Sequence, residues 1–112
     1  MRILIIACII VGAIIAGVLL YPAYIVSIVN ETQSDLTGFQ INGGGVNVNV
    51  PTILAGEQSV QSFTIQQDGT LILTGTFEGR SIVGTIDPYV THGLRVHKIV
   101  RVEVDGGIKV DK

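Results

Sequence analysis

Residues 3–20 contain no charged or hydrogen-bonding side chain except the thiol of Cys8, and this run constrains the fold more than any other feature. The nineteen residues from Ile3 to Tyr21 would form a helix about 28 Å long, close to the hydrocarbon thickness of a bilayer. A chain of 112 residues is too small to bury a helix that is apolar on every side. We therefore predict a transmembrane helix over residues 1–22 and a separate domain over residues 23–112.

The basic residues predict how this helix is oriented in the membrane. Arg2 precedes the apolar run, and no Lys or Arg follows it until Arg80. This distribution predicts a cytoplasmic N-terminus and a C-terminal domain in the periplasm or outside the cell. The apolar stretch exceeds the roughly 7 to 15 residues of a signal-peptide core, and its far end has no Ala-x-Ala type site. An uncleaved signal anchor is therefore expected, with the lipid bilayer as the first partner.

Small side chains recur along the predicted helix. Cys8, Gly12 and Ala16 are spaced four residues apart, and Ala13 and Gly17 repeat the spacing on the adjacent row. Such a face lets two helices approach closely and gain dispersion contacts. We expect this face to contact other membrane protein subunits, or a second copy of the chain in a homo-oligomer.

Strand signals begin immediately after Pro22. Residues 23–29 are rich in β-branched side chains, which fit strands better than helices. Further strands are predicted at residues 36–41, 46–50, 60–66, 71–77, 82–86, 94–104 and 108–110. Residues 60–66 and 71–77 are expected to form a hairpin in which Gly69 supplies a positive φ. Seven or eight short strands with frequent turns predict an all-β domain, an immunoglobulin-like β-sandwich.

Several short motifs resemble those of small uncharacterised bacterial membrane proteins built from one N-terminal helix and a compact sandwich. They are Val29-Asn30, Ala55-Gly56-Glu57, Asp68-Gly69-Thr70-Leu71, and Tyr89-Val90-Thr91 with Gly93. The resemblance covers residues 24–110 and implies an architecture without an activity.

Residues 1–24 also resemble the start of a mature type IV pilin, because an apolar helix is followed by Pro22-Ala23-Tyr24. The chain departs from bacterial pilins at Ile5, where they have glutamate, and at Arg2. This resemblance implies a filament subunit that uses the helix as the polymer core. Pilins continue the helix well past the proline, so an extended segment there would favour an anchor instead.

The charge distribution excludes one class of partner and indicates another. The net charge is −2, so no overall basic field attracts nucleic acid. Five acids and no base lie between Glu31 and Glu78, whereas residues 80–112 hold six bases and four acids. Residues 80–112 are therefore mildly basic, and we interpret part of them as a candidate partner surface. An aromatic residue in this region can supply contact area for a partner. The residues of this candidate surface are Tyr89, His92, Arg95, His97 and Arg101.

The sequence contains no recognisable set of catalytic residues. The single cysteine lies in the apolar run, so a thiol nucleophile and an intramolecular disulfide are excluded. His92 and His97 have Asp87 and Glu103 near them, but a straight strand points the two imidazoles to opposite faces, and a shared metal site needs a bend at Gly93. Neither a catalytic set nor a nucleophile elbow accompanies them. We predict no enzymatic activity, no catalytic or cofactor-binding residue, no cofactor and no bound metal.

Two short motifs, a run of three glycines and an Asn-Glu-Thr triplet, need no functional explanation. Residues 43–45 are all glycine, lack the lysine of a phosphate loop and predict a flexible turn. The Asn30-Glu31-Thr32 triplet matches an N-glycosylation pattern but lies too near the expected bilayer to be a good acceptor.

The sequence supports three functional hypotheses. The first is a single-pass membrane protein whose outer sandwich is a non-enzymatic accessory or structural subunit of a larger membrane assembly. The second is a pilin-type filament subunit. The third is a module that binds a small ligand or metal outside the cytoplasm.

Overall fold

The structure is a computed structural model that describes residues 23–111, and every regular element in this range is a β-strand. The strands are β1 (Tyr24–Asn30), β2 (Thr37–Gly43), β3 (Val46–Asn49), β4 (Gln58–Phe63), β5 (Gly69–Phe77), β6 (Arg80–Val90), β7 (His97–Val102) and β8 (Ile108–Asp111). The all-β prediction is confirmed. Residues 23–111 include no helix with the length and hydropathy of a membrane span. The predicted anchor, including Cys8, Gly12, Ala13, Ala16 and Gly17, lies outside the described residues.

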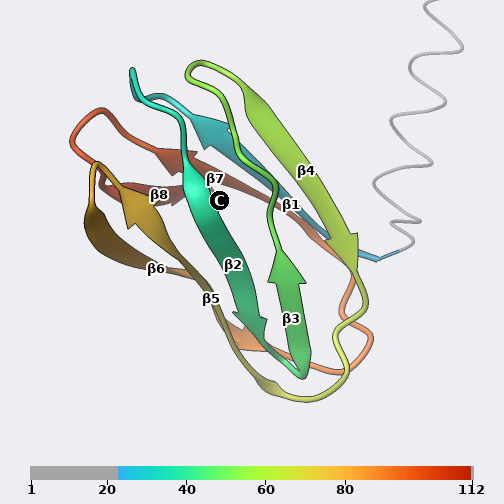
Figure 1. Ribbon diagram of the computed structural model, residues 1–112. Coiled ribbons are helices and arrows are strands. Elements are labelled where there is room, and N and C mark those ends of the chain that lie inside the picture. The colour runs from blue at the N-terminus through green and yellow to red at the C-terminus, as the bar shows by residue number, and fades with distance from the viewer. Residues whose placement is uncertain (1–22, 112) are drawn as a thin grey trace, which may run out of the picture.

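The strands form two sheets of four that face each other (Figure 1). The first sheet has the order β4-β1-β7-β8, and the second has the order β3-β2-β5-β6. Strand β1 is interior to its sheet because it pairs antiparallel with β4 and parallel with β7. Every other strand pairing is antiparallel. The first strand after the apolar run is therefore held by hydrogen bonds on both edges.

The core forms between the sheets because apolar side chains alternate along each strand. In β1, Tyr24, Val26 and Ile28 are buried, whereas Ile25 and Val29 face the other way and are half-buried. The Tyr24 ring stacks on Phe63 of β4, with centroids 5.6 Å apart. The rest of the buried apolar core is Leu36, Phe39, Ile41, Val50, Ile53, Ile65, Leu71, Leu73, Phe77, Ile86, Val90, Val100 and Val102. This burial is the main source of stability for the domain.

The predicted hairpin of residues 60–66 and 71–77 is wrong. Strand β4 pairs with β1 in the first sheet, whereas β5 pairs with β2 and β6 in the second, so the segment between them crosses from one sheet to the other. Gly69 does not have the expected positive φ. The crossing segment is instead held by the β2–β3 turn, where the carbonyl of Gly44 accepts bonds from the backbone N–H groups of Gln66 and Gln67.

The strand predicted over residues 94–104 is shorter than expected. A turn at Gly93, with φ of +75°, delays β7 until His97. At the other end a backbone bond from Glu103 N–H to Gly107 O closes a turn, and this leaves Val104 69% exposed. Val104 has the same parity as the buried Val100 and Val102, but alternation holds only while the strand continues.

The two ends of the sandwich differ in the loops that they gather. We call the end at which β1 begins the proximal end; it holds residues 43–45, 64–68 and 91–96 (Figure 1, lower side). The opposite, distal end holds residues 31–36, 50–57, 78–79 and 103–107. Residues 1–22 connect to the domain at the proximal end, through Ala23.

Candidate interaction surface

The structure divides the candidate partner surface between two regions. Tyr89, His92 and Arg95 lie at the proximal end, at or beside the loop that connects β6 to β7. His97 and Arg101 lie on β7, and both point away from the core on the outer face of the first sheet. The structure therefore places three of the five residues at the proximal end and two on the outer face of the first sheet.

The outer face of the first sheet contains a shallow groove of about 670 Å³ across β4, β1 and β7. Its apolar lining comes from Ile25, Val29, Val60 and Ile99, of which Val60 is 56% exposed. The strand register explains the grouping, because Ser27 lies directly between Val60 of β4 and Ile99 of β7. We call this set of residues the first-sheet groove. Apolar side chains gathered on an outer face are typical of a contact surface.

Polar groups lie at the centre and rim of the first-sheet groove. Ser27 Oγ and His97 Nε2 share a hydrogen bond of 2.7 Å, and Ser27 is only 7% exposed. At the rim, Arg101 Nε donates to Asp111 at 2.9 Å and Nη1 to Glu31 at 3.2 Å. The bond to Asp111, followed by its charge, raises the pKa of Arg101, so the guanidinium stays charged. The rim beside the apolar strip therefore holds one cation paired with two carboxylates.

The outer face of the second sheet is different in composition. Its outward positions are mostly amides and hydroxyls, namely Gln40, Asn42, Asn47, Asn49, Thr74, Thr76, Ser81 and Thr85, and the half-buried Ile72 lies among them between Asn42 and Thr85. Val83, 67% exposed on β6, is its main exposed apolar side chain. The two outer faces are thus chemically unequal: the second is mostly polar around Ile72 and Val83, whereas the first gathers four aliphatic side chains in a groove.

At the proximal end, two tyrosines are hydrogen-bonded to two aspartates. The Tyr24 hydroxyl donates to Asp87 Oδ2 at 2.9 Å and so joins β1 to β6 across the two sheets. Burial, and then the bond to Asp87, raises the pKa of Tyr24 far above its ordinary value near 10. The Tyr89 hydroxyl donates to Asp68 Oδ2 at 3.2 Å, which raises the pKa of Tyr89, yet its side chain is 62% exposed. Tyr24 is therefore a structural link, whereas Tyr89 presents a fixed aromatic surface.

The structure shows a role for Asn30 that the sequence motif did not suggest. This side chain is fully buried at the distal end of β1. Its Nδ2 donates to the carbonyls of Ser34 and Ile53, and its Oδ1 accepts from the N–H and hydroxyl of Thr32. An asparagine two residues before a threonine is also typical of an Asx turn, and that signal was available in the sequence. In the folded domain, Asn30 is inaccessible as a glycosylation acceptor.

The histidines do not converge on a metal site. His92 is exposed in the β6–β7 loop, and His97 bonds Ser27 on the outer face of the first sheet. Residues 23–111 contain no group of three or more His, Cys, Asp or Glu side chains arranged to hold a metal ion.

Comparison with known proteins gives a match in fold and none in sequence. No family model matches the chain, and no curated protein matches it. A solution NMR structure of a protein from Eubacterium rectale is similar, with a TM-score of 0.53 over 80% of this chain and 86% of that one. The two sequences are 15% identical, so the similarity extends to the fold alone.

Proposed function

We propose that this chain is a single-pass membrane protein whose β-sandwich is a non-enzymatic accessory or structural subunit of a larger membrane assembly. The observation that carries the proposal is the inequality of the two outer faces. One outer face is mostly amides and hydroxyls around Ile72 and Val83, whereas the other presents the first-sheet groove with Ile25, Val60 and Ile99. Proteins use exposed apolar surfaces rimmed by polar groups for binding other proteins.

The anchor is proposed from the apolar run of residues 3–20, with the N-terminus in the cytoplasm and the sandwich in the periplasm or outside the cell. Strand β1 begins at Tyr24, only two residues after Pro22, and it is paired on both edges. Motion of such a strand relative to its sheet is small. A partner held beside the anchor would therefore meet the groove in a fixed orientation.

The partner surface that fits the groove is apolar, with a basic or hydrogen-bond-donating group at one side. Aliphatic side chains would cover Ile25, Val60 and Ile99, and the donating group would reach the carboxylates of Glu31 and Asp111. A soluble domain of another membrane subunit, or a second copy of this chain, can supply such a surface. The extended conformation of residues 24–30 supports an anchor over a pilin-type filament, in which the helix continues beyond the proline.

The immunoglobulin-like class is part of the proposal. Two facing sheets, with four connections that cross between them, support it. The parallel pairing of β1 with β7 distinguishes this domain from a sandwich of purely antiparallel strands.

The test combines membrane extraction with matched groove variants. The full chain is expected to resist extraction from membranes by alkaline carbonate and to dissolve in detergent together with a defined partner. Val60→Glu places a charge in the groove and should abolish co-purification of that partner, whereas Val83→Glu, on the other sheet, should leave it intact. Release by carbonate alone would contradict the anchor, and equal co-purification with both variants would contradict the groove.

A further inference from the structure

We propose that the proximal end of the sandwich rests on the headgroup layer of an anionic bilayer, with Tyr89 in the interfacial region. This inference depends on the proposed membrane anchor and adds an orientation to it. Its first support is the position of residue 23, because the apolar run joins the domain at this end. A strand that begins two residues after Pro22 leaves almost no spacer between the bilayer and the loops around it.

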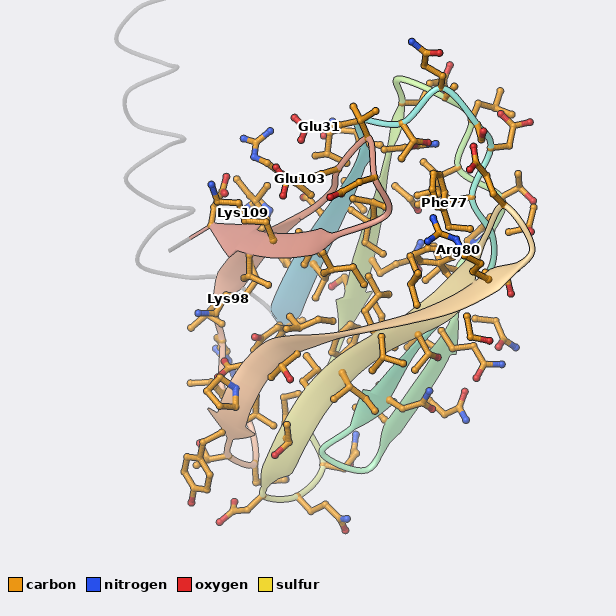
Figure 2. All side chains as sticks on the ribbon, turned by 90° about the vertical axis from the view of Figure 1, so that its left-hand side faces the viewer. Glu31, Phe77, Arg80, Lys98, Glu103 and Lys109 are labelled. Atoms are coloured by element: carbon orange, nitrogen blue, oxygen red, sulfur yellow. The ribbon has the colours of Figure 1, made fainter. Side chains whose placement is uncertain are left out.

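The second support is an uneven distribution of charge between the two ends. Figure 2 shows Glu31 and Glu103 together at the distal end, whereas Lys98 lies toward the opposite end of the molecule. Exposed carboxylates crowd the distal loops and outnumber the cations near them, which are Arg80, Arg101 and Lys109. These acids are Glu31, Asp35, Glu57, Glu78, Glu103 and Asp105. A surface of phosphate headgroups repels this end.

The proximal end carries less negative charge. Residues 43–45, 64–68 and 91–96 contain one acid, Asp68, and one permanent cation, the exposed Arg95, together with His92, and Asp87 near the end of β6 adds a second acid. Both oxygens of Asp68 accept bonds, from the Tyr89 hydroxyl and from His92 N–H, so its charge is partly satisfied within the domain. The seven residues of β1 separate the ends by roughly 20 Å, about twice the screening length at 0.1 M salt. Proximal contact therefore keeps the six distal acids beyond the reach of the surface charge.

The third support is the exposed ring of Tyr89. A tyrosine that is 62% exposed is suited to the boundary between headgroups and acyl chains, where tyrosine is enriched because one end is apolar and the other is polar. The bonds of its hydroxyl to Asp68 and of its N–H to Asp87 fix the residue in the folded domain. Arg95 in the neighbouring loop can reach phosphate oxygens.

Tryptophan scanning tests this orientation cleanly, because the chain contains no native tryptophan. Tyr89→Trp places the fluorophore at the proximal end, Val104→Trp at the distal end and Val60→Trp in the first-sheet groove. Each full-length variant would be reconstituted into vesicles of phosphatidylglycerol and phosphatidylcholine, with and without brominated acyl chains. We expect the Tyr89→Trp emission to be blue-shifted and at least about twofold more strongly quenched by bromine than either other variant. Circular dichroism and melting curves would check that all three variants fold alike.

The outcomes separate failure of the orientation from failure of the anchor. If the wild-type chain does not float with the vesicles, the membrane anchor itself is contradicted. If it floats but Val104→Trp or Val60→Trp is quenched as strongly as Tyr89→Trp, the anchor stands and the proposed orientation is overturned. Replacing phosphatidylglycerol by phosphatidylcholine should weaken the quenching of Tyr89→Trp. Quenching unchanged by this replacement would contradict the electrostatic part of the proposal.

Discussion

The two ends of the sandwich are held together by different means. At the proximal end, glycine backbone packs against other backbone: the Gly44 carbonyl accepts two N–H groups at 2.8 and 3.1 Å, and Gly43 lies against Thr70. At the distal end, one side chain, Asn30, satisfies groups on three neighbouring residues. Backbone packing of this kind depends on the absence of a side chain, whereas the distal network depends on the presence of a single amide.

This difference predicts the largest effect for Gly43→Ala. A β-carbon built at Gly43 lies 1.8 Å from the carbonyl oxygen of Thr70, and the residue has φ of +125°. Because the obstacle is backbone, we expect a loss of about 4 kcal/mol in the free energy of unfolding, measured with urea. Gly56→Ala is the matched control: it also has positive φ, but nothing lies within 4 Å, and its loss should be about 1 kcal/mol. Equal losses would show that backbone conformation, not close packing, governs the proximal turn.

The next largest effect is expected for Asn30→Ala at the distal end. The variant removes four hydrogen bonds and leaves buried groups of Ser34, Ile53 and Thr32 with fewer partners. We expect a loss of about 3 kcal/mol and a fall in Tm of about 12 to 24 °C by calorimetry. Asn49→Ala, at an exposed position on β3, should change stability by less than about 0.5 kcal/mol. A small effect at Asn30 would mean that the distal loops are held mainly by apolar packing.

The smallest effect is expected for Tyr24→Phe, and it should depend on pH. Loss of the bond to Asp87 should cost about 1 kcal/mol at neutral pH. The folded state raises the pKa of Tyr24, so above its ordinary value near 10 the unfolded chain releases a proton that the folded chain keeps. Stability of the wild type should therefore fall as pH rises above about 10. Urea unfolding between pH 8 and 11 should give a shallower fall for Tyr24→Phe, and identical slopes would exclude Tyr24 as the cause.

Local sequence signals predicted strands well where alternation was clear. The β-branched residues after Pro22 became β1, and the alternating Val46-Asn47-Val48-Asn49 became β3. The signals failed where pairing is not local. The Asp68-Gly69 turn looked like a hairpin, but its flanking strands belong to different sheets, and local turn chemistry does not specify which strands will pair.

The first-sheet groove as a whole could not be identified from the sequence. Sequence analysis singled out His97 and Arg101, which line it, but not Ile99. The structure gives Ile99 a place in the first-sheet groove, beside Ser27, which separates it from Val60. Because β1, β4 and β7 are far apart in sequence, no periodicity along one strand reveals a groove shared by all three.

The sequence by itself determined that this chain has an apolar run followed by short strands, and that the domain is all-β, because side-chain shape and alternation act locally. Tertiary structure alone decided which strands share a sheet, which face gathers apolar residues and which end collects the acids. Those outcomes depend on pairings such as β1 with β7, which join residues about 70 positions apart through backbone hydrogen bonds that any sequence can make. The choice among such pairings follows from packing the whole core.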